Sequence, residues 1–310
     1  MKTHLTIFLS LFILFSASAQ NKKVWIDADT GNEMDDLYAI SYLLLDTTVE
    51  VVGISSAHFN NADLLTYKIW NSYPTKNINT VKISQQLNEK LIKYMNCENI
   101  PHPIGANQMI GRAWGGQEPA SSPASAKIIE KAHQMKPGEK LDILVIGASS
   151  NISSALLTDS TIKSKIHVIL LGARYFDDKK VWDKSEFNIR NDLNSFDYLL
   201  NLEGLELTVM PVNVAIALQF QRKTAKDKLQ NKNEFFNFLY RRWDLVSAGE
   251  SWIMWDLAMV EAYLHPELAN LIIAKTPPEN NQRDISVYND IDNQKMEELY
   301  WSRLLNAKFK

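Results

Sequence analysis

Short apolar runs and helical patterns alternate along this chain, and together they predict an α/β fold. Nearly continuous apolar runs indicate strands at 24–26, 49–55, 141–146, 166–171 and 205–210. The stretches between them indicate helices at 35–45, 60–71, 122–134, 151–157 and 195–202. Strands without a polar face are typical of parallel sheets that helices cover on both sides. We therefore expect a doubly wound, mainly parallel sheet flanked by helices.

After residue 215 the pattern becomes helical. The segments "NEFFNFLYRRWDLVSAG", "WDLAMVEAYL" and "KMEELYWSRLL" carry this pattern. The sequence shows no internal repeat and no low-complexity linker. We therefore expect residues 20–310 to form a single domain with a helical C-terminal part.

The first 19 residues have the pattern of a secretory signal peptide. Lys2 provides a basic start, residues 5–15 are apolar, and small residues occupy 17–19. The apolar run is too short to span a bilayer. A lipoprotein is not expected, because there is no cysteine near the cleavage site. We expect cleavage after Ala19 and an exported protein, which is periplasmic if the source is a Gram-negative bacterium. After cleavage we expect no membrane attachment.

Charge and cysteine content narrow the choice of partner. The formal net charge is −3, which gives no electrostatic reason to expect nucleic acid or an anionic membrane as a partner. Cys97 is the only cysteine, so the chain has no internal disulfide. Its stability must therefore come from its core.

The segment "DADTGNEMDD", residues 27–36, concentrates negative charge directly after the first predicted strand. Two carboxylates ~4 Å apart repel by roughly 4 kcal/mol at an effective dielectric constant near 20. Acidic residues at a helix start would account for Asp35 and Asp36. They would not account for Asp27 and Asp29, which extend a strand that ought to be buried. A hard cation with oxygen ligands, such as Ca²⁺, would compensate the repulsion.

Several segments, in order, resemble the inosine-uridine-preferring nucleoside hydrolases. "DADTGNEMDD" looks like the family's aspartate signature, and "GISSAHFNN" is similar to its strand ending near a substrate-binding asparagine. "ILVIGASSN" lies in a stretch similar to the central βαβ block. "SEFNIRND" and "WDLAMVEAYLHPEL" are similar to the late substrate and metal segments. The likeness spans roughly residues 24–270, so it covers most of the chain.

This resemblance implies a Ca²⁺ site, a ribose site and a catalytic base. The implied metal ligands are Asp29, Asp36, Asp256 and the backbone carbonyl of Ile146. Asp29 would also take a proton from the attacking water, and Asp27 would support the metal loop. The implied ribose ligands are Asp35, Glu186, Asn188 and one or both of Asn60 and Asn61. Members of the family are dimers or tetramers, so we expect a homodimer or homotetramer.

The implied reaction needs these residue types. Cleavage of an N-glycosidic bond passes through a sugar with oxocarbenium character, which nearby carboxylates stabilise. A metal ion lowers the pKa of a water ligand. A site that hydrogen-bonds both ribose hydroxyls would discriminate against deoxy sugars, because its polar groups would be left unpaired.

The spacer "TGNEM" separates Asp29 from Asp35 by about two residues more than in the common family members. One interpretation is a ribose contact from Asn32 or Glu33. The other is a longer surface turn that uses Gly31. The sequence supports the two interpretations equally.

Trp255 precedes Asp256 at a position where pyrimidine-accepting relatives carry a histidine that protonates the leaving base. An indole cannot act as that acid at neutral pH, whereas it can stack on a purine. Core packing is the alternative, because "SWIMWDL" is apolar. The proposed second stacking partners are Trp114, Tyr175 and Trp182.

Lys180 lies where the family often has an asparagine, in the charged segment "RYFDDKKVWDK".

Two other functions are compatible with parts of the sequence. "VWIDADT" loosely matches haloacid-dehalogenase-type phosphatases, which would use Asp27 as nucleophile with Mg²⁺. An exported nucleoside- or sugar-binding protein that has lost catalysis is the non-enzymatic alternative. The ordered segments favour a Ca²⁺-dependent hydrolase of purine ribonucleosides over both.

Overall fold

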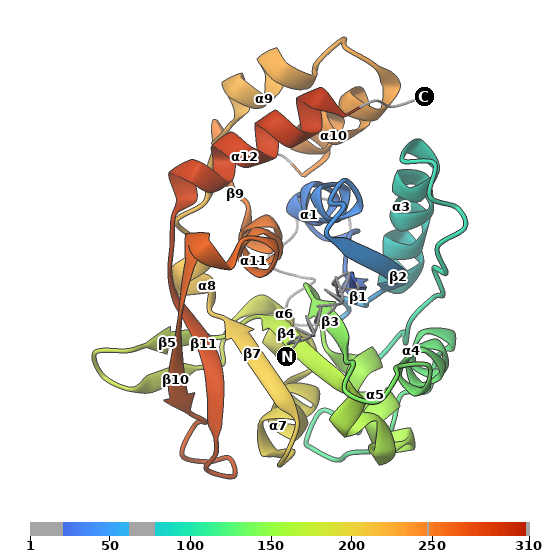
Figure 1. Ribbon diagram of the computed structural model, residues 1–310, viewed down its shortest axis with the longest axis vertical. Helices are drawn as coiled ribbons and strands as arrows, with labels where there is room; N and C mark the ends of the chain where they lie inside the picture. Colours follow the sequence, from blue (N-terminus) through green and yellow to red (C-terminus); the bar gives the residue numbers. More distant parts are fainter. Residues whose placement is uncertain (1–20, 62–77, 247, 308–310) are drawn as a thin grey trace, which may run out of the picture.

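The computed structural model describes residues 21–61, 78–246 and 248–307. The predicted signal peptide at 1–19 and most of the predicted helix at 60–71 lie outside these residues. At the centre is a seven-stranded sheet in the order β10-β11-β7-β4-β3-β1-β2 (Figure 1). Its strands are β1 Lys22–Ala28, β2 Val49–Ser56, β3 Leu141–Val145, β4 Ile166–Leu171, β7 Glu206–Met210, β10 Ala269–Lys275 and β11 Asp284–Ile291.

The strand pairings are parallel except between β10 and β11. β3 is buried along its whole length and β1 along most of it, as expected for strands covered by helices on both faces. The carboxyl ends of β1, β3, β4 and β7 therefore meet at one edge of the sheet. The predicted doubly wound, mainly parallel sheet is confirmed.

Helices cover both faces of the sheet (Figure 1). α1, α11 and α12 lie on one side, and α4, α5 and α7 lie on the other. The helices are α1 Asp35–Leu44, α3 Thr80–Tyr94, α4 Pro123–His133, α5 Ser150–Thr158, α6 Phe187–Asn191, α7 Leu193–Asn201, α8 Val212–Ala215, α9 Arg222–Leu229, α10 Glu234–Leu245, α11 Trp255–Leu264 and α12 Asn293–Asn306, with short 3₁₀ turns η1 Ser160–Lys165 and η2 Pro266–Leu268.

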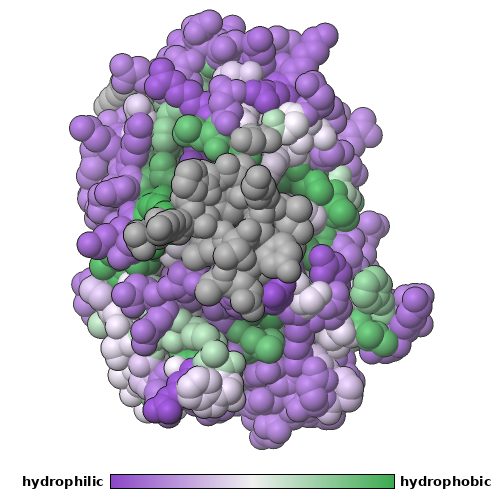
Figure 2. All heavy atoms as spheres, turned by 180° about the vertical axis from the view of Figure 1, so that it is seen from behind, coloured by the Kyte–Doolittle hydropathy of each residue, from purple (hydrophilic) through white to green (hydrophobic). Residues whose placement is uncertain are grey.

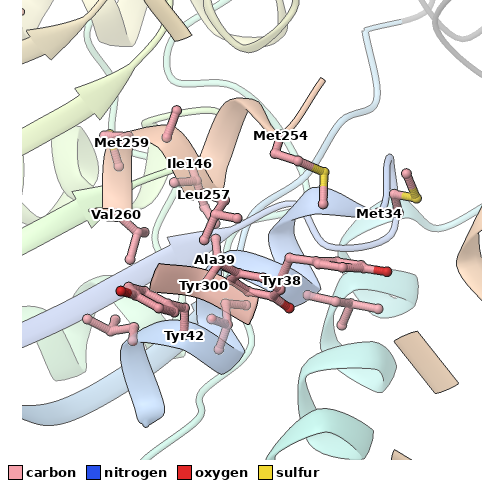
Figure 3. Close-up of a cluster of buried hydrophobic side chains, with 14 of the residues drawn as sticks. Met34, Tyr38, Ala39, Tyr42, Ile146, Met254, Leu257, Met259, Val260 and Tyr300 are labelled. Atoms are coloured by element: carbon pink, nitrogen blue, oxygen red, sulfur yellow. The ribbon is translucent and has the colours of Figure 1, made fainter. Parts of the chain in front are cut away.

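A core of aromatic and aliphatic side chains fixes α1 against α11 and α12. Figure 3 shows Tyr38 of α1, Leu257 of α11 and Tyr300 of α12 in this core, and all three are fully buried. The rings of Tyr38 and Tyr300 stack with their centroids 5.6 Å apart. Because such a core is close-packed, it holds the first turns of α1 and α11 in a defined relative position. Those two turns carry the acidic residues of the site.

The C-terminal part contains strands as well as the predicted helices. β10 and β11 form an antiparallel edge of the sheet, and β8 Gln219–Gln221 pairs with β9 Ser251–Ile253. The sequence analysis missed these strands. β10 lies at the edge of the sheet, where Leu271 and Ile273 are exposed, so it lacks the buried apolar run that identified the central strands.

One face of the described chain is mostly polar. Figure 2 shows that hydrophilic residues cover most of the described surface on the face opposite to that of Figure 1, with apolar residues nearer its middle. None of the helices in the described ranges is long and apolar enough to cross a membrane.

A small hairpin, β5 Arg174–Phe176 and β6 Val181–Asp183, follows β4.

Candidate active site

A cavity of about 340 Å³ opens at the carboxyl edge of the sheet. Loops after β1, β3 and β4 line it together with the starts of α1 and α11 and the β8–β9 hairpin. This is the edge at which ligands bind in open α/β sheets. Nine of the residues predicted for the site line the cavity: Asp29, Asn32, Asp35, Asp36, Ile146, Glu186, Asn188, Trp255 and Asp256.

Asp27 lies beneath the cavity rather than in its wall. It is fully buried, and its Oδ1 accepts hydrogen bonds from Ser55 Oγ and, at 2.9 Å, from Asn151 Nδ2. Its backbone carbonyl accepts a bond from Ile146 N at 2.9 Å. Burial raises the pKa of the Asp27 carboxyl to about 7. This arrangement agrees with a supporting role, because Asp27 joins the loop after β1 to the residue after β3.

The most compact acidic group joins the first turns of two helices. Carboxylate oxygens of Asp35, Asp36 and Asp256 lie within 4.8 Å of one another. Asp35 Oδ2 accepts a hydrogen bond from the backbone N–H of Asp256 at 3.0 Å, in the first turn of α11. Helix N-termini favour negative charge, which partly offsets the repulsion. The family resemblance implied Asp29, Asp36 and Asp256 as metal ligands and Asp35 as a ribose ligand. The structure places Asp35 with Asp36 and Asp256, and Asp29 lines the same cavity.

Several oxygens in this region lack the partners that buried polar atoms normally have. Asp29 Oδ2, Asp35 Oδ1 and Asp36 Oδ1 accept no hydrogen bond from any residue in the described ranges. Burial, and then repulsion from neighbouring carboxylates, hold the pKa of Asp29, Asp36 and Asp256 well above its usual range. Burial raises the pKa of Asp35 to about 6.

A cation fits these donors. Carboxylate oxygens that lie within 4.8 Å of one another, as those of Asp35, Asp36 and Asp256 do, are the ligands that a hard divalent ion prefers. Its charge would lower the pKa values that burial and mutual repulsion raise. The residues present are therefore suited to hold such an ion.

The "TGNEM" spacer forms part of the cavity wall instead of a surface turn. Asn32 and Glu33 both line the cavity. Gly31 is buried, and a Cβ built on it would lie 2.7 Å from Ile83 Cγ2. Arg242 Nη2 on α10 donates to the Glu33 carbonyl at 2.6 Å. The surface-turn interpretation is therefore wrong, because the spacer is packed between the β1 edge and α10.

Glu186, the N-cap of α6, and Asn188 in the first turn of α6 also line the cavity. Glu186 caps this helix by accepting from the N–H groups of Asn188 and Ile189 at 3.0 and 3.1 Å. Asn188 Nδ2 donates to the carbonyl of Ile146 at 3.2 Å. The predicted metal-binding carbonyl thus lies against a predicted sugar-binding side chain, at the junction of the two predicted sites.

Asn60 and Asn61 do not line the cavity. Asn60 Nδ2 donates to the carbonyl of Asn107, and Asn61 Nδ2 donates to the carbonyl of Arg190 at 2.6 Å. Both amides thus join segments beside the cavity. The structure does not bring these two residues together with the other predicted ribose ligands.

The aromatic wall consists of Trp255 and a tryptophan that sequence reasoning missed, Trp252 of β9. None of the proposed second partners lines the cavity. Trp114 is 82% exposed, whereas Tyr175 and Trp182 pack on each other with ring centroids 4.7 Å apart. Trp252 lies in the same "SWIMWDL" stretch, and the β8–β9 hairpin, which no local pattern predicted, places it in the wall.

Lys180 lies at the turn of the β5–β6 hairpin and not in the cavity. Its Nζ bonds Asp177 Oδ1 at 2.5 Å, and its side chain is mostly exposed. Arg174, at the base of that hairpin, does line the cavity and donates to Asp183 Oδ2 at 3.2 Å. Arg174 is therefore the residue of this charged segment that can affect a ligand.

Comparison with known proteins agrees with this geometry. The chain matches the family described as "Inosine-uridine preferring nucleoside hydrolase" over residues 24–298. It is 26% identical to "Probable uridine nucleosidase 2" of Oryza sativa subsp. japonica over 152 residues, 46% of this chain and 44% of that protein. The match thus spans less than half the length of that curated relative.

Solved structures share the fold. A plant nucleoside hydrolase, PpNRh1, superposes with a TM-score of 0.71 at 17% identity, covering 93% of this chain and 100% of that one. A purine-preferring ribonucleoside hydrolase from Gardnerella vaginalis gives a TM-score of 0.67 at 17% identity, covering 92% of this chain and 98% of that one.

Proposed function

The chain belongs to the inosine-uridine preferring nucleoside hydrolase family, and on that premise we propose that it is a Ca²⁺-dependent N-ribohydrolase that cleaves purine ribonucleosides to base and ribose. One observation carries the proposal. Carboxylates with orphaned oxygens lie at the carboxyl edge of the sheet, in a cavity that also has two tryptophans in its wall.

The residues that would hold Ca²⁺ are Asp29, Asp36 and Asp256, with the carbonyl of Ile146. Asp35 offers a carboxylate oxygen within 4.8 Å of those of Asp36 and Asp256, and its Oδ1 is unpartnered among the described residues, so it would be in reach to take part. Only oxygen donors are involved, which favours Ca²⁺ over metals that seek nitrogen or sulfur. When bound, the ion would lower the pKa of a water ligand and offset the negative charge of the site.

The side chains themselves would bind the sugar and accept a proton. Asp29 would take a proton from the attacking water. Asp35, Glu186 and Asn188 would hydrogen-bond ribose hydroxyls, and Asn32 stands in the wall beside them. As the bond between C1′ and the base breaks, positive charge develops on the sugar and these carboxylates stabilise it.

The purine preference is supported by the aromatic wall. Trp252 and Trp255 offer stacking surfaces, and no histidine appears among the described residues that line the cavity. The relative from Oryza sativa is named a probable uridine nucleosidase, which makes uridine the necessary comparison substrate.

Residues 1–19 support export, to the periplasm in a Gram-negative source, and the family resemblance supports a homodimer or homotetramer.

The phosphatase alternative does not agree with the structure. Its nucleophile would be Asp27, which is fully buried and already hydrogen-bonded to Ser55 and Asn151.

The test is hydrolysis by the protein that lacks residues 1–19, with Ca²⁺, of inosine, adenosine, guanosine, uridine and cytidine, followed as reducing sugar. Release of ribose from purine nucleosides, lost in Asp29→Ala, is the expected result. Ca²⁺ binding without release from any nucleoside would instead identify the catalytically inactive binding protein. Release that is unchanged in Asp29→Ala would contradict the proposed role of Asp29.

A further inference from the structure

Exposed apolar side chains gather on two neighbouring elements of the molecule. Nine large apolar side chains are exposed in the described ranges, and four of them belong to β10 and to the β5–β6 hairpin: Phe176, Val181, Leu271 and Ile273. The two elements touch, because Trp182 Nε1 of the hairpin donates to the Lys275 carbonyl of β10 at 2.9 Å. Exposed apolar patches on soluble proteins mark interaction sites.

The exposed residues of β10 alternate with buried ones. Ala274 belongs to the core cluster on the α4, α5 and α7 side of the sheet, and Ile272 packs against that cluster. Because successive side chains of a strand point to opposite faces, Leu271 and Ile273 point to the other face. There they are 48% and 67% exposed, so the described residues leave this margin of the sheet uncovered.

The β5–β6 hairpin follows the same alternation. Tyr175 and Trp182 are paired across its two strands and pack on the same core cluster. Phe176 and Val181 form the next pair, so they point away from that cluster. Figure 1 shows the hairpin projecting beside β10 at the left of the molecule. The hairpin and β10 therefore both present apolar side chains that face away from the same core.

β10 is the last strand of the sheet, and part of its backbone has no partner. Thr276 N–H donates to the Arg283 carbonyl at 3.0 Å, in register with the β10–β11 pairing. In an antiparallel pair the backbone groups of alternate residues face the partner strand, so those of Leu271 and Ile273 face outward. No residue in the described ranges bonds them there.

Both ends of this free edge are closed. The Lys275 carbonyl also faces outward, and the indole of Trp182 bonds it. At the other end, a bulge interrupts the register between Asn270 and Leu271. Proteins protect edge strands with bulges, charged side chains and covering segments. The segment between these two devices, residues 271–273, is left open.

The open segment is complementary to a second copy of itself. In antiparallel pairing, residues whose backbone groups face outward must oppose one another. With both ends closed, Leu271 must oppose Ile273 of the second copy, about a two-fold axis at Ile272. Apolar side chains then meet on the exposed face. Lys275 is the one charged residue of β10 and bonds Asp284 at 2.7 Å, and the axis places its two copies at opposite ends of the pairing.

We propose that β10 and the β5–β6 hairpin form an interface with a second copy of this chain, in which residues 271–273 pair antiparallel with themselves. The inference rests on the homo-oligomer of the proposed function and names its surface. The two sheets join into one continuous sheet across the axis. Phe176 and Val181 lie against the second copy beside the paired strands and extend the apolar contact.

Sedimentation of the protein that lacks residues 1–19 tests the surface. We expect a dimer or tetramer, and Ile273→Lys should halve its mass or raise the Kd of association at least about a hundredfold, because an unpaired ammonium would be buried against Leu271. Leu245→Lys is the matched control, since Leu245 is 60% exposed at the end of α10. It should leave the mass unchanged. Circular dichroism checks that both variants fold.

Two results would overturn the proposal. If Ile273→Lys keeps the mass and the Kd of the native protein, the copies meet through another surface. If the native protein is a monomer, the free edge is left to a strand of a different protein.

A disulfide tests the register of the pairing. Directly opposed residues at a position without hydrogen bonds have Cα atoms ~4.5 Å apart, within the range of about 4.4–6.8 Å that a disulfide needs. With Cys97→Ser in place, Ile272→Cys should give a covalent dimer on oxidation. Asn270→Cys is the control, because its two copies would lie more than about 13 Å apart. Failure of Ile272→Cys to cross-link, or cross-linking of Asn270→Cys instead, would refute the pairing.

The outcomes also distinguish this inference from the proposed function. If the native protein hydrolyses nucleosides and Ile273→Lys stays associated, the proposed function stands and the inference about the surface is wrong. If Ile273→Lys dissociates but the native protein hydrolyses no nucleoside, the interface stands and the proposed reaction fails.

Discussion

The carboxylate of Asp35 joins two helices that begin 220 residues apart, by accepting a hydrogen bond from the backbone N–H of Asp256 at 3.0 Å. α1 begins at Asp35, and α11 begins at Trp255. One oxygen of Asp35 thus satisfies an N–H group at a helix start, and the other has no hydrogen-bond partner among the described residues. The same side chain therefore has a structural role and is placed for the proposed ligand-binding role.

Two substitutions separate these roles. In the Ca²⁺-loaded protein, Asp35→Asn retains an acceptor for the Asp256 N–H, whereas Asp35→Ala does not. We expect Asp35→Ala to lower the free energy of unfolding by ~1 kcal/mol more than Asp35→Asn, and both to lower kcat/KM by about a hundredfold or more. Urea unfolding and steady-state kinetics measure the two effects. Equal stabilities of the two variants would show that the bond to Asp256 contributes nothing.

Removal of calcium should destabilise the protein. Binding to the folded state alone stabilises it by ~2.7 kcal/mol when the ligand concentration is a hundred times Kd. We expect a chelator to lower Tm and Ca²⁺ to restore it, with Mg²⁺ less effective because it retains its water ligands. Calorimetry with each ion makes the measurement. Asp256→Asn should reduce the increase in Tm that Ca²⁺ causes. An undiminished increase in Tm would show that the ion binds elsewhere.

The pH dependence of the metal-free protein should have an unusual sign. Burial raises the pKa of Asp27 to about 7 and that of Asp35 to about 6, above the value of 3.8 for an unperturbed Asp. Between the unperturbed pKa and the raised pKa of each carboxyl, the folded state binds more protons than the unfolded state. The free energy of unfolding therefore falls as pH rises through this range. Unfolding by urea in chelator at several pH values from 5 to 7.5 tests this. A free energy of unfolding that increases over this pH range in the metal-free protein would contradict the raised pKa values of Asp27 and Asp35.

Arg242 should hold the spacer in its position beside the cavity. It is buried and donates to the Glu33 carbonyl at 2.6 Å. Arg242→Met would leave that partly buried carbonyl without its charged donor, and we expect a loss of ~1–3 kcal/mol of stability with a higher KM. Arg242→Lys restores the positive charge, so it should recover part of the lost stability and bring KM part of the way back to the native value. Equal KM values for the native protein and Arg242→Met would show that the spacer does not depend on this contact.

Trp255→His should lower kcat/KM for purine nucleosides about tenfold, because base–aromatic stacking contributes ~1–3 kcal/mol. Trp114→His is the matched control, since Trp114 is 82% exposed and lies away from the cavity. Both variants are assayed with inosine and guanosine. Unchanged purine turnover in Trp255→His would refute the stacking role.

Much of the site could be predicted because its residues lie next to strong local signals. Asp29 follows an apolar strand, and Asp256 lies in the first turn of a mostly apolar helix. Trp252 and Arg174 could not be predicted in this way. Each lies on a three-residue strand, β9 or β5, which is too short to leave a periodic pattern.

The sequence by itself determined the α/β class and the carboxylate cluster, because both depend on patterns within a few consecutive residues. The tertiary structure alone decided which carboxylates come together and what surrounds them. Asp35 joins Asp256 because the buried core packs α1 against α11. Glu33 lies in the cavity wall with its carbonyl bonded to Arg242. These contacts join residues more than 200 positions apart, and packing between distant segments leaves no local pattern in the sequence.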